Sequence, residues 1–165
     1  MKKILIINPP VYDFKLYDEW MNPFGLLYIS NWVKQSGMEV IYRDYLFKRN
    51  SSKRTYGRGF FERSDAELPP ALSFLQKKYF RFGVSAEEII NDLAELDFDL
   101  VFVGSFVTFW YPGVFEIINT LKLLHPSKKI VLGGIYATLC PEHAEKLSGA
   151  DVVLPGPFDR KAAEK

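Results

Sequence analysis

Short apolar runs alternate with helical patterns along the chain, and this alternation constrains the fold more than any other feature. The runs that we interpret as strands are Lys3 to Asn8, Glu39 to Tyr45, Leu100 to Ser105, Lys129 to Leu132 and Asp151 to Pro155. Most are apolar at consecutive positions, which is typical of parallel strands covered by helices on both faces. We therefore predict an α/β fold, a Rossmann-like or flavodoxin-like three-layer α/β/α sandwich. Its five-stranded parallel sheet would have the order 2-1-3-4-5.

The segments between these runs carry helix signals. We predict helices over residues 23–37, 86–96, 112–125 and 141–147. The first would have Asn22 as its N-cap, and the second opens with Ser85 and Glu88 in capping-box spacing. The residues expected to face the sheet from these two helices are Leu26, Leu27, Ile29, Trp32, Val33, Ile89, Ile90, Leu93 and Leu96. The strand around Ile41 is the most polar, so we place it at an edge of the sheet.

The segment from about residue 47 to residue 83 is unlike its flanks. It is too long for an ordinary connection inside a compact domain. Its basic and aromatic side chains include Lys48, Arg49, Lys53, Arg54, Tyr56, Arg58, Phe60, Phe61 and Arg63. Such a surface either docks on a neighbouring domain or grips nucleic acid or phosphate. Because the net charge of the chain is only +1, we favour docking over nucleic-acid binding.

Composition bounds the remaining classes. A length of 165 residues with 48% hydrophobic content suits one domain, which we place at residues 1–156. The first apolar run is too short for a signal peptide or a membrane span, so we expect a cytoplasmic protein with no membrane partner. The one cysteine, Cys140, excludes an internal disulfide and cannot hold an iron–sulfur cluster. Cys140 and His143 form only half a metal site, so we interpret them as the start of a helix and predict no metal there.

Two glycines, Gly133 and Gly134, follow the fourth predicted strand. Glycine has no Cβ, so a flat ligand can approach the backbone closely. In open α/β sheets ligands bind beyond the carboxyl ends of the strands. The ends of the first and third strands would lie beside the glycine pair, and their residues are Asn8, Pro9, Pro10, Ser105, Val107 and Thr108. We predict one ligand site along this edge.

Other nucleotide and phosphate folds fit the first strand end poorly. The turn after Asn8 lacks the carboxylates with which a receiver domain binds magnesium, and it also lacks the glycine-rich turn of a dinucleotide site. The glycines at 57 and 59 do not follow a strand, so we regard them as a chance match. The aromatic block 109–111 would pack in the core or at an interface, or else cover a flat cofactor.

The strand-end residues have a familiar spacing. Ser105 with Val107, followed by Gly133 and Gly134, resembles the second and third elements of the cobalamin-binding signature. The first element is absent. It is an Asp-x-His-x-x-Gly run whose histidine becomes the lower cobalt ligand, and neither histidine of this chain follows the first strand. The resemblance implies that cobalamin would be held base-off, with no protein imidazole on cobalt.

More widely, the chain resembles the N-terminal domain of cobalamin-binding radical S-adenosylmethionine proteins. The resemblance spans residues 3–156 and rests on Ile7 to Asp13, Leu16 to Trp20, Pro23 to Tyr28, Tyr56 to Phe60, Tyr79 to Gly83 and Gly133 to His143. It implies a following radical domain as partner, in which a Cys-x-x-x-Cys-x-x-Cys run holds a 4Fe-4S cluster that cleaves S-adenosylmethionine. We expect an excised domain or a truncated gene product, with residues 157–165 as a charged tail or the start of that partner domain.

The resemblance also assigns the cofactor-binding residues. One side of the corrinoid would be lined by Asn8, Pro9 and Pro10, and the second side by Ser105, Val107 and Thr108. A tail pocket would be formed by Gly133, Gly134, Tyr136, Ala137 and Thr138, and the last strand would end at Gly156. The implied chemistry is radical methylation or rearrangement by the full-length enzyme. No catalytic residue is assigned, and this chain alone is not expected to catalyse the reaction. A Gly134→Val substitution is expected to abolish cofactor retention and to leave the fold intact.

Two alternatives stay open. The domain could be a scaffold that has lost its cofactor, docks the radical domain and shapes substrate access. If the bulky side chains of Tyr136 and Trp110 fill the site, this alternative is favoured. An open groove above the glycine pair would favour corrinoid binding. The basic segment could instead bind nucleic acid, with a steep loss of binding as salt rises. The acidic residues Asp13, Asp18 and Glu19 are expected to pair with arginines of that segment or of the partner domain.

Overall fold

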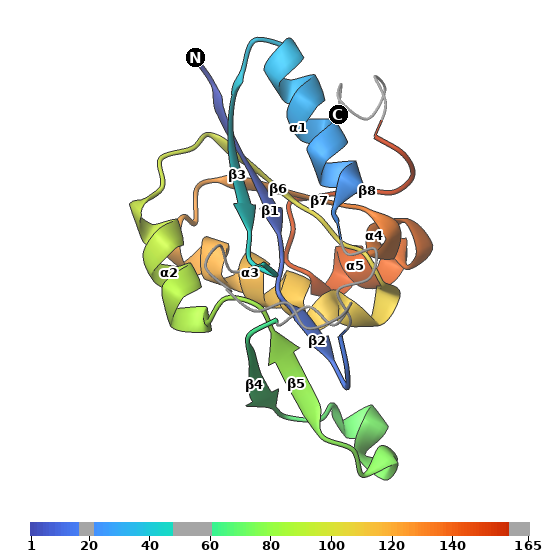
Figure 1. Ribbon diagram of the computed structural model, residues 1–165. Coiled ribbons are helices and arrows are strands. Elements are labelled where there is room, and N and C mark those ends of the chain that lie inside the picture. Colours follow the sequence, from blue (N-terminus) through green and yellow to red (C-terminus); the bar gives the residue numbers. More distant parts are fainter. Residues whose placement is uncertain (17–21, 48–60, 159–165) are drawn as a thin grey trace.

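Five parallel strands form the central sheet of the computed structural model, which describes residues 1–16, 22–47 and 61–158. They are β1 (Lys3–Asn8), β3 (Glu39–Asp44), β6 (Leu100–Val103), β7 (Lys129–Gly133) and β8 (Val152–Leu154). Their spatial order is β3-β1-β6-β7-β8, and each neighbouring pair is parallel (Figure 1). Numbered among themselves, the strands have the order 2-1-3-4-5. The predicted flavodoxin-like α/β/α fold and its polar edge strand are therefore confirmed.

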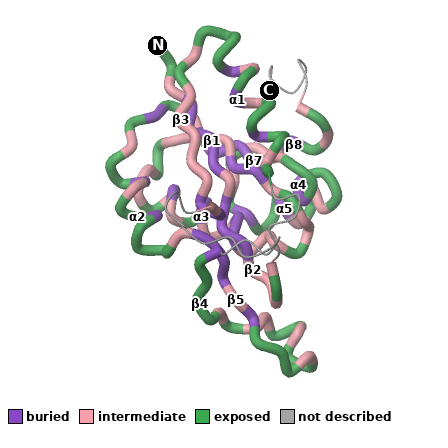
Figure 2. The backbone as a smooth tube through the Cα atoms, viewed as in Figure 1, coloured by how far each residue is buried: buried purple, intermediate pink, exposed green. Residues whose placement is uncertain are grey.

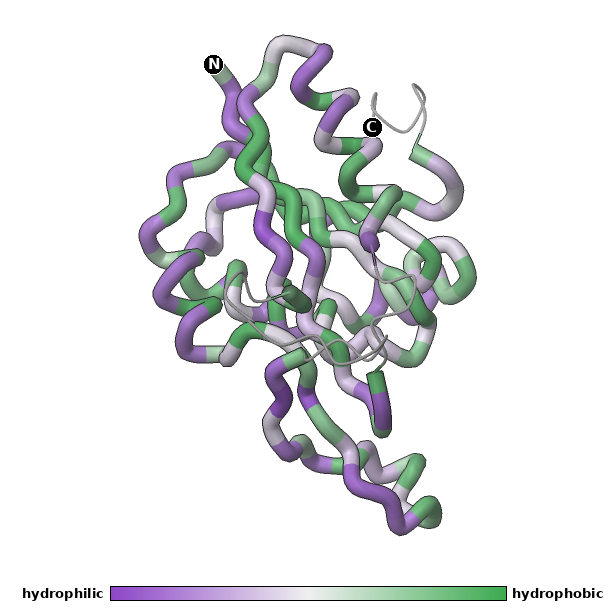
Figure 3. Tube along the Cα trace, in the orientation of Figure 1, coloured by the Kyte–Doolittle hydropathy of each residue, from purple (hydrophilic) through white to green (hydrophobic). Residues whose placement is uncertain are grey.

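Helices cover both faces of this sheet, which places the core on each side of β1. The helices are α1 (Phe24–Gln35), α2 (Ala86–Glu95), α3 (Tyr111–Leu124), α4 (Ile135–Leu139) and α5 (Pro141–Leu147). Ile4 and Ile6 pack with α1, whereas Leu5 and Ile7 belong to the larger core formed with the other helices. The alternation follows from the two-residue period of a strand. The buried residues and the hydrophobic residues both concentrate along these strands (Figures 2 and 3).

The helix predictions hold with small shifts. The capping box of α2 is present, since Glu88 donates its N–H to the Ser85 hydroxyl and accepts from the Ser85 N–H. Helix α1 begins one residue later than predicted, with Pro23 rather than Asn22 at the N-cap. Leu27 and Ile90, which we expected to face the sheet, are each 44% exposed. Each follows directly after a buried residue of its helix, and a step of one residue turns a side chain by about 100°.

A second, antiparallel sheet was not predicted. It contains β2 (Val11–Asp13), β5 (Tyr79–Phe82) and β4 (Arg63–Ala66), in that order, with the 3-10 helix η1 (Pro70–Leu75) between β4 and β5. The β4–η1–β5 arm projects from the central sheet (Figure 1). The described part of the inserted segment thus pairs with β2 of its own chain. Residues 48–60, which carry most of its basic side chains, lie outside the described residues, as do the predicted motif stretches there and at 17–20.

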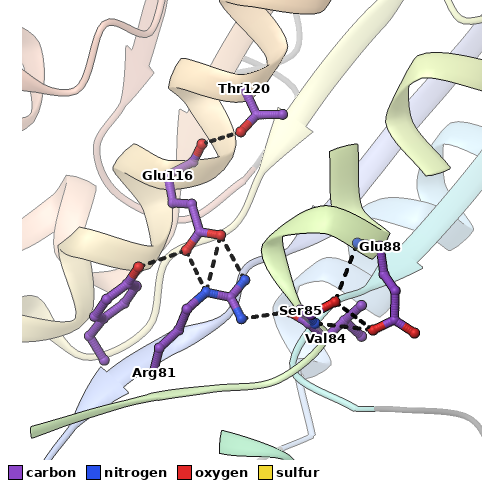
Figure 4. A network of polar contacts seen from close by, with 7 residues as sticks. Arg81, Val84, Ser85, Glu88, Glu116 and Thr120 are labelled. Atoms are coloured by element: carbon purple, nitrogen blue, oxygen red, sulfur yellow. Dashed lines mark hydrogen bonds and ion pairs between the residues drawn. The ribbon is translucent and has the colours of Figure 1, made fainter. Parts of the chain in front are cut away.

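A buried ion pair joins the small sheet to the main domain. Arg81 of β5 is 7% exposed, and its Nε and Nη2 atoms donate to the carboxylate of Glu116 on α3 at 2.7 to 3.1 Å (Figure 4). Its Nη1 donates to the Val84 carbonyl at 2.6 Å, and the Tyr12 hydroxyl of β2 donates to the same carboxylate at 3.0 Å. Among the described residues, both side chains that donate to the Glu116 carboxylate therefore belong to the small sheet. The pair fixes that sheet on α3.

The ion pair gives a test of this docking. An Arg81→Met substitution leaves the Glu116 carboxylate, whose side chain is 17% exposed, with one hydroxyl donor, and removing one partner of a buried pair costs about 3 kcal/mol. We expect a loss of that order in the free energy of unfolding by urea. Lys146→Met is the control, because the Lys146–Glu142 pair is exposed and 3.9 Å long, and it should leave stability unchanged. Equal effects of the two substitutions would contradict the structural role of Arg81.

The Tyr12 hydroxyl gives a second test, by pH. Burial first, and then the charge and hydrogen bond of Glu116, raise the pKa of Tyr12 to about 12. A tyrosine in the unfolded chain titrates near pH 10, so the unfolded state releases its proton first. The contribution of Tyr12 to stability is therefore complete below about pH 10 and is lost as the pH rises toward 12. Urea unfolding between pH 9 and 11.5 should lose stability less steeply in Tyr12→Phe than in the wild type. Parallel curves would exclude this linkage.

Candidate functional site

A cavity of about 970 Å³ opens at the carboxyl ends of the central strands. The strand ends supply one wall, which includes Asn8, Pro9, Pro10, Gly104, Ser105, Gly133, Gly134, Leu154 and Gly156. The first two turns of α1 supply the facing wall, with Phe24, Gly25, Leu26, Tyr28 and Ile29. The volume lies at the upper end of the usual range for ligand pockets. Most lining side chains are apolar, so the cavity suits a large ligand with extensive apolar surface.

The β1 end of the cavity is held rigid by its neighbours. The Nδ2 group of Asn8 donates to Oδ1 of Asp44, at the end of β3, over 2.8 Å. Burial raises the pKa of Asp44, although the hydrogen bonds from Asn8 and from backbone N–H groups oppose this shift. On the other side, Gly113 of α3 packs on the backbone of Pro10, and a Cβ at residue 113 would overlap the Pro10 carbonyl oxygen. The turn after β1 is therefore clamped between β3 and α3.

Ser105 joins the β6 end to the β7 end. Its hydroxyl donates to the Gly133 carbonyl at 2.6 Å, and its own carbonyl accepts from the Ile135 N–H at 3.0 Å. Gly134 has a φ of +102°, and a Cβ there would overlap the Ser105 carbonyl oxygen. Gly133 differs, because a Cβ there would meet only the Leu154 carbonyl oxygen, at 3.9 Å. Gly134 thus serves the turn, and Gly133 leaves open space in the cavity wall.

Thr138 closes the β8 side of the cavity. Its hydroxyl donates to the Gly134 carbonyl at 2.8 Å and accepts from the Gly156 N–H at 2.9 Å. A Cβ at Gly156 would meet no atom within 4 Å, so this residue also leaves open space. Beyond it, Phe158 packs edge-on against Trp32 of α1 and Phe102 of β6. The chain after β8 therefore turns back across the sheet toward α1.

The structure brings most of the predicted site residues to this cavity. Those that line it are Asn8, Pro9, Pro10, Ser105, Gly133, Gly134, Thr138 and Gly156. Val107 and Thr108 do not line it, because the chain there turns away into the 3-10 helix η2 (Thr108–Trp110). Tyr136 and Ala137 were expected in a tail pocket but lie in the core, 1% and 0% exposed. The reason is α4, which begins directly after Gly134 and turns these two side chains inward.

Neither histidine of the sequence lines the cavity. His143 belongs to α5; its Nδ1 is 2.6 Å from the Tyr136 hydroxyl, and its ring packs near Tyr111 and Phe115. His125 follows α3 and contacts the Leu93 carbonyl through Nε2 at 2.8 Å. Within the described residues, no three His, Cys, Asp or Glu side chains are grouped to hold a metal ion. Cys140 is the N-cap of α5 and His143 lies in its first turn, so the predicted helix start at these residues is present.

That α1 and Trp110 line the cavity was not predicted from the sequence. Phe24 and Tyr28 are 67% and 62% exposed, although both lie in an amphipathic helix that packs on the sheet. Large apolar residues on the outer side of such a helix were the available signal. Opposite them, Trp110 lines the cavity and donates its Nε1 proton to Asp13 at 2.7 Å. Asp13 thus accepts a hydrogen bond from an indole. Asp18 and Glu19 lie outside the described residues, as do most arginines of the inserted segment, so the predicted pairing with arginines stays a prediction.

A comparison with protein families shows to which family the chain belongs. A family model described as the B12 binding domain matches residues 75–164, more than half of the chain. The chain belongs to the B12-binding domain family. The match includes β6, β7 and β8 with their strand ends, and it begins after the β1 turn, where the chain lacks a histidine.

Two solved structures share the fold of this B12-binding domain. A cobalamin-binding protein from Desulfitobacterium hafniense aligns over 99% of this chain and 54% of its own, with 15% identity and a TM-score of 0.54. This chain thus spans about half the length of that protein. The response regulator TrrA from Thermotoga maritima, in complex with Mg²⁺ and BeF, aligns over 99% of this chain and 95% of its own, with 15% identity and a TM-score of 0.53. At such identity both likenesses concern the fold alone.

A comparison with curated proteins finds no match. Among the described residues, none of the helices has the length and apolar character that a membrane span requires.

Gly133 and Gly134 should respond differently to an added methyl group. Gly134→Ala forces a side chain into the left-handed region and against Ser105, which costs about 2 kcal/mol or more of folding stability. Gly133→Ala meets no close atom and should unfold in urea like the wild type. For the same reason, the expectation that Gly134→Val spares the fold is wrong. Equal stability of Gly134→Ala and Gly133→Ala would contradict this geometry.

Proposed function

We propose that this B12-binding domain holds a corrinoid in the strand-end cavity, base-off and without a protein imidazole on cobalt. The observation that carries the proposal is the open cavity above Gly133, in a member of this family, with neither histidine in its walls. A bound corrinoid supplies a cobalt centre suited to methyl transfer or rearrangement. The chain's own residues would bind and orient it.

The cavity walls fit such a group in size and character. Gly133 and Gly156 leave the backbone open to a flat ligand, because a Cβ at either residue would meet no atom closer than 3.9 Å. The exposed rings of Phe24 and Tyr28 offer apolar surface at the mouth, and Trp110 stands in the opposite wall. Burial of such surface would provide much of the binding free energy.

The turn after β1 supports the absence of a cobalt ligand from protein. Pro9 and Pro10 carry no imidazole, and proline has no backbone N–H. Their position is fixed by the packing of Pro10 on Gly113 and by the Asn8–Asp44 hydrogen bond. This turn would therefore press an apolar, rigid surface against the ligand.

The wider context is also a proposal. We infer that the domain is the N-terminal part of a radical S-adenosylmethionine enzyme, in which S-adenosylmethionine and a 4Fe-4S cluster belong to a separate radical domain. The resemblance of residues 3–156 to that class supports it. The single cysteine, Cys140, is consistent with a cluster held elsewhere. Methylation or rearrangement would then be an activity of the full-length protein, and a cytoplasmic location is expected of it.

The alternatives receive less support from the cavity. A scaffold without cofactor would be favoured by bulk filling the site, yet Tyr136 lies in the core and the space above Gly133 is open. For nucleic-acid binding, Arg81 is engaged with Glu116 and Arg63 stacks on the Phe80 ring at 4.3 Å. The corrinoid therefore stays the first proposal.

Titration with hydroxocobalamin tests the proposal. We expect saturable binding by calorimetry and a visible spectrum of the base-off type. Gly133→Val puts an isopropyl group into the cavity and should weaken binding about tenfold or more, which corresponds to about 1.4 kcal/mol of binding free energy. Ala94→Val, on the exposed side of α2, adds the same kind of bulk away from the cavity and should bind like the wild type.

Two further variants test the proposal that no histidine of this chain binds cobalt. His125→Gln and His143→Gln should each give the wild-type spectrum with hydroxocobalamin, because neither ring reaches the cavity. A spectral change in one of them would identify that histidine as a cobalt ligand. No binding by the wild type, with the fold intact by circular dichroism, would refute the proposal for this chain and leave the scaffold alternative.

A further inference from the structure

On the side of the cavity opposite α1, nearly all the lining polar side chains are hydrogen-bonded to other groups of the protein. The Ser105 hydroxyl donates to Gly133, and the Thr138 hydroxyl both donates to Gly134 and accepts from Gly156. The indole N–H of Trp110 donates to Asp13. A ligand in the cavity would therefore find few polar groups available on this wall.

Asn8 is the exception. Its Nδ2 group is held by Asp44, but its carbonyl oxygen Oδ1 accepts no hydrogen bond within the described part of the chain. In that part, no fully buried side-chain polar atom lacks a partner, so Oδ1 of this residue is open rather than sealed. Asn8 lines the cavity, and the open atom is a hydrogen-bond acceptor.

The orientation of the Asn8 amide is fixed by Asp44. An ionised carboxylate only accepts hydrogen bonds, so the NH₂ half of the amide must face it. Asp44 is itself held in place, because its Oδ1 also accepts from the N–H groups of Leu46 and Phe47, at 3.1 and 3.3 Å. Turning the amide over would set two acceptor oxygens against each other. The carbonyl oxygen is thus the half of Asn8 that remains for a ligand.

We infer that Asn8 selects a carboxamide over a carboxylate on the periphery of the corrinoid, with Asp44 as the residue that positions it. The inference rests on the proposed function. A corrinoid carries peripheral carboxamides, whose N–H groups can donate to Oδ1 of Asn8. A carboxylate at the same place has no proton to donate and would set its negative charge against the Asn8 oxygen, with the Asp44 carboxylate behind it.

The first experiment needs no variant. Hydroxocobalamin and its b-, d- and e-monocarboxylic acid derivatives, separated from one another, are titrated into the wild-type domain at pH 7. We expect hydroxocobalamin to bind, and at least one of the three acids to bind about tenfold or more weakly, since an unmatched acceptor costs on the order of one hydrogen bond. Equal affinity of all four compounds would overturn the inference and leave the proposed function intact. Failure of hydroxocobalamin itself to bind would overturn both.

The Asp44→Ala variant tests the positioning role. With no acceptor side chain at residue 44, the Asn8 amide would be free to turn and present its NH₂ group to the discriminated acid. We expect the preference for the carboxamide to fall to within about threefold. Asp92→Ala is the matched control, because Asp92 also accepts hydrogen bonds from the β3 side, from Arg43 and Tyr45, but lies away from the cavity. It should keep the wild-type preference. An undiminished preference in a folded Asp44→Ala domain would exclude Asp44 as the positioning residue.

Discussion

The close fit of Gly134 on Ser105 is the contact on which the ligand site depends. The Ser105 carbonyl occupies the space that a side chain at Gly134 would need, and its hydroxyl ties down the Gly133 carbonyl. With the two strand ends locked in this way, Gly133 can leave its outer side open without loosening the sheet. The same fit places the first residue of α4 directly after Gly134. The Thr138 hydroxyl of α4 can therefore accept the N–H of Gly156, just beyond β8. The contact between Gly134 and Ser105 thus fixes both the Gly133 wall and the Thr138 wall of the cavity.

The second structural dependence lies at β1. The turn after this strand leads directly into β2, which joins the small antiparallel sheet, and Arg81 and Glu116 hold that sheet on α3. Because β1 supplies both Asn8 and the path to β2, the small sheet also stabilises the cavity wall. The long inserted segment therefore has a role within this domain, whatever else its residues outside the described ranges contact.

Sequence reasoning predicted the features that depend on local pattern. Strand positions and the α2 capping box follow from runs and caps that a few neighbouring residues specify, whereas the strand order was predicted from the fold class that the alternation indicates. It missed features that arise only in three dimensions. Helix α4 has five residues and no cap signal, and β2 has three residues whose partner is far along the chain. As a result, Tyr136 was placed in the site instead of the core, and the contribution of Phe24 and Tyr28 could not be read from strand ends alone.

The central claim is a corrinoid held in this cavity with no nitrogen ligand from protein on cobalt. Electron paramagnetic resonance of the domain loaded with cob(II)alamin tests it most directly, since the unpaired electron on cobalt reports an axial nitrogen as a threefold splitting of its lines. The account predicts bound cofactor whose lines lack that splitting, in the wild type and in His143→Gln alike. A threefold splitting in the wild type that disappears when a histidine is replaced would contradict it.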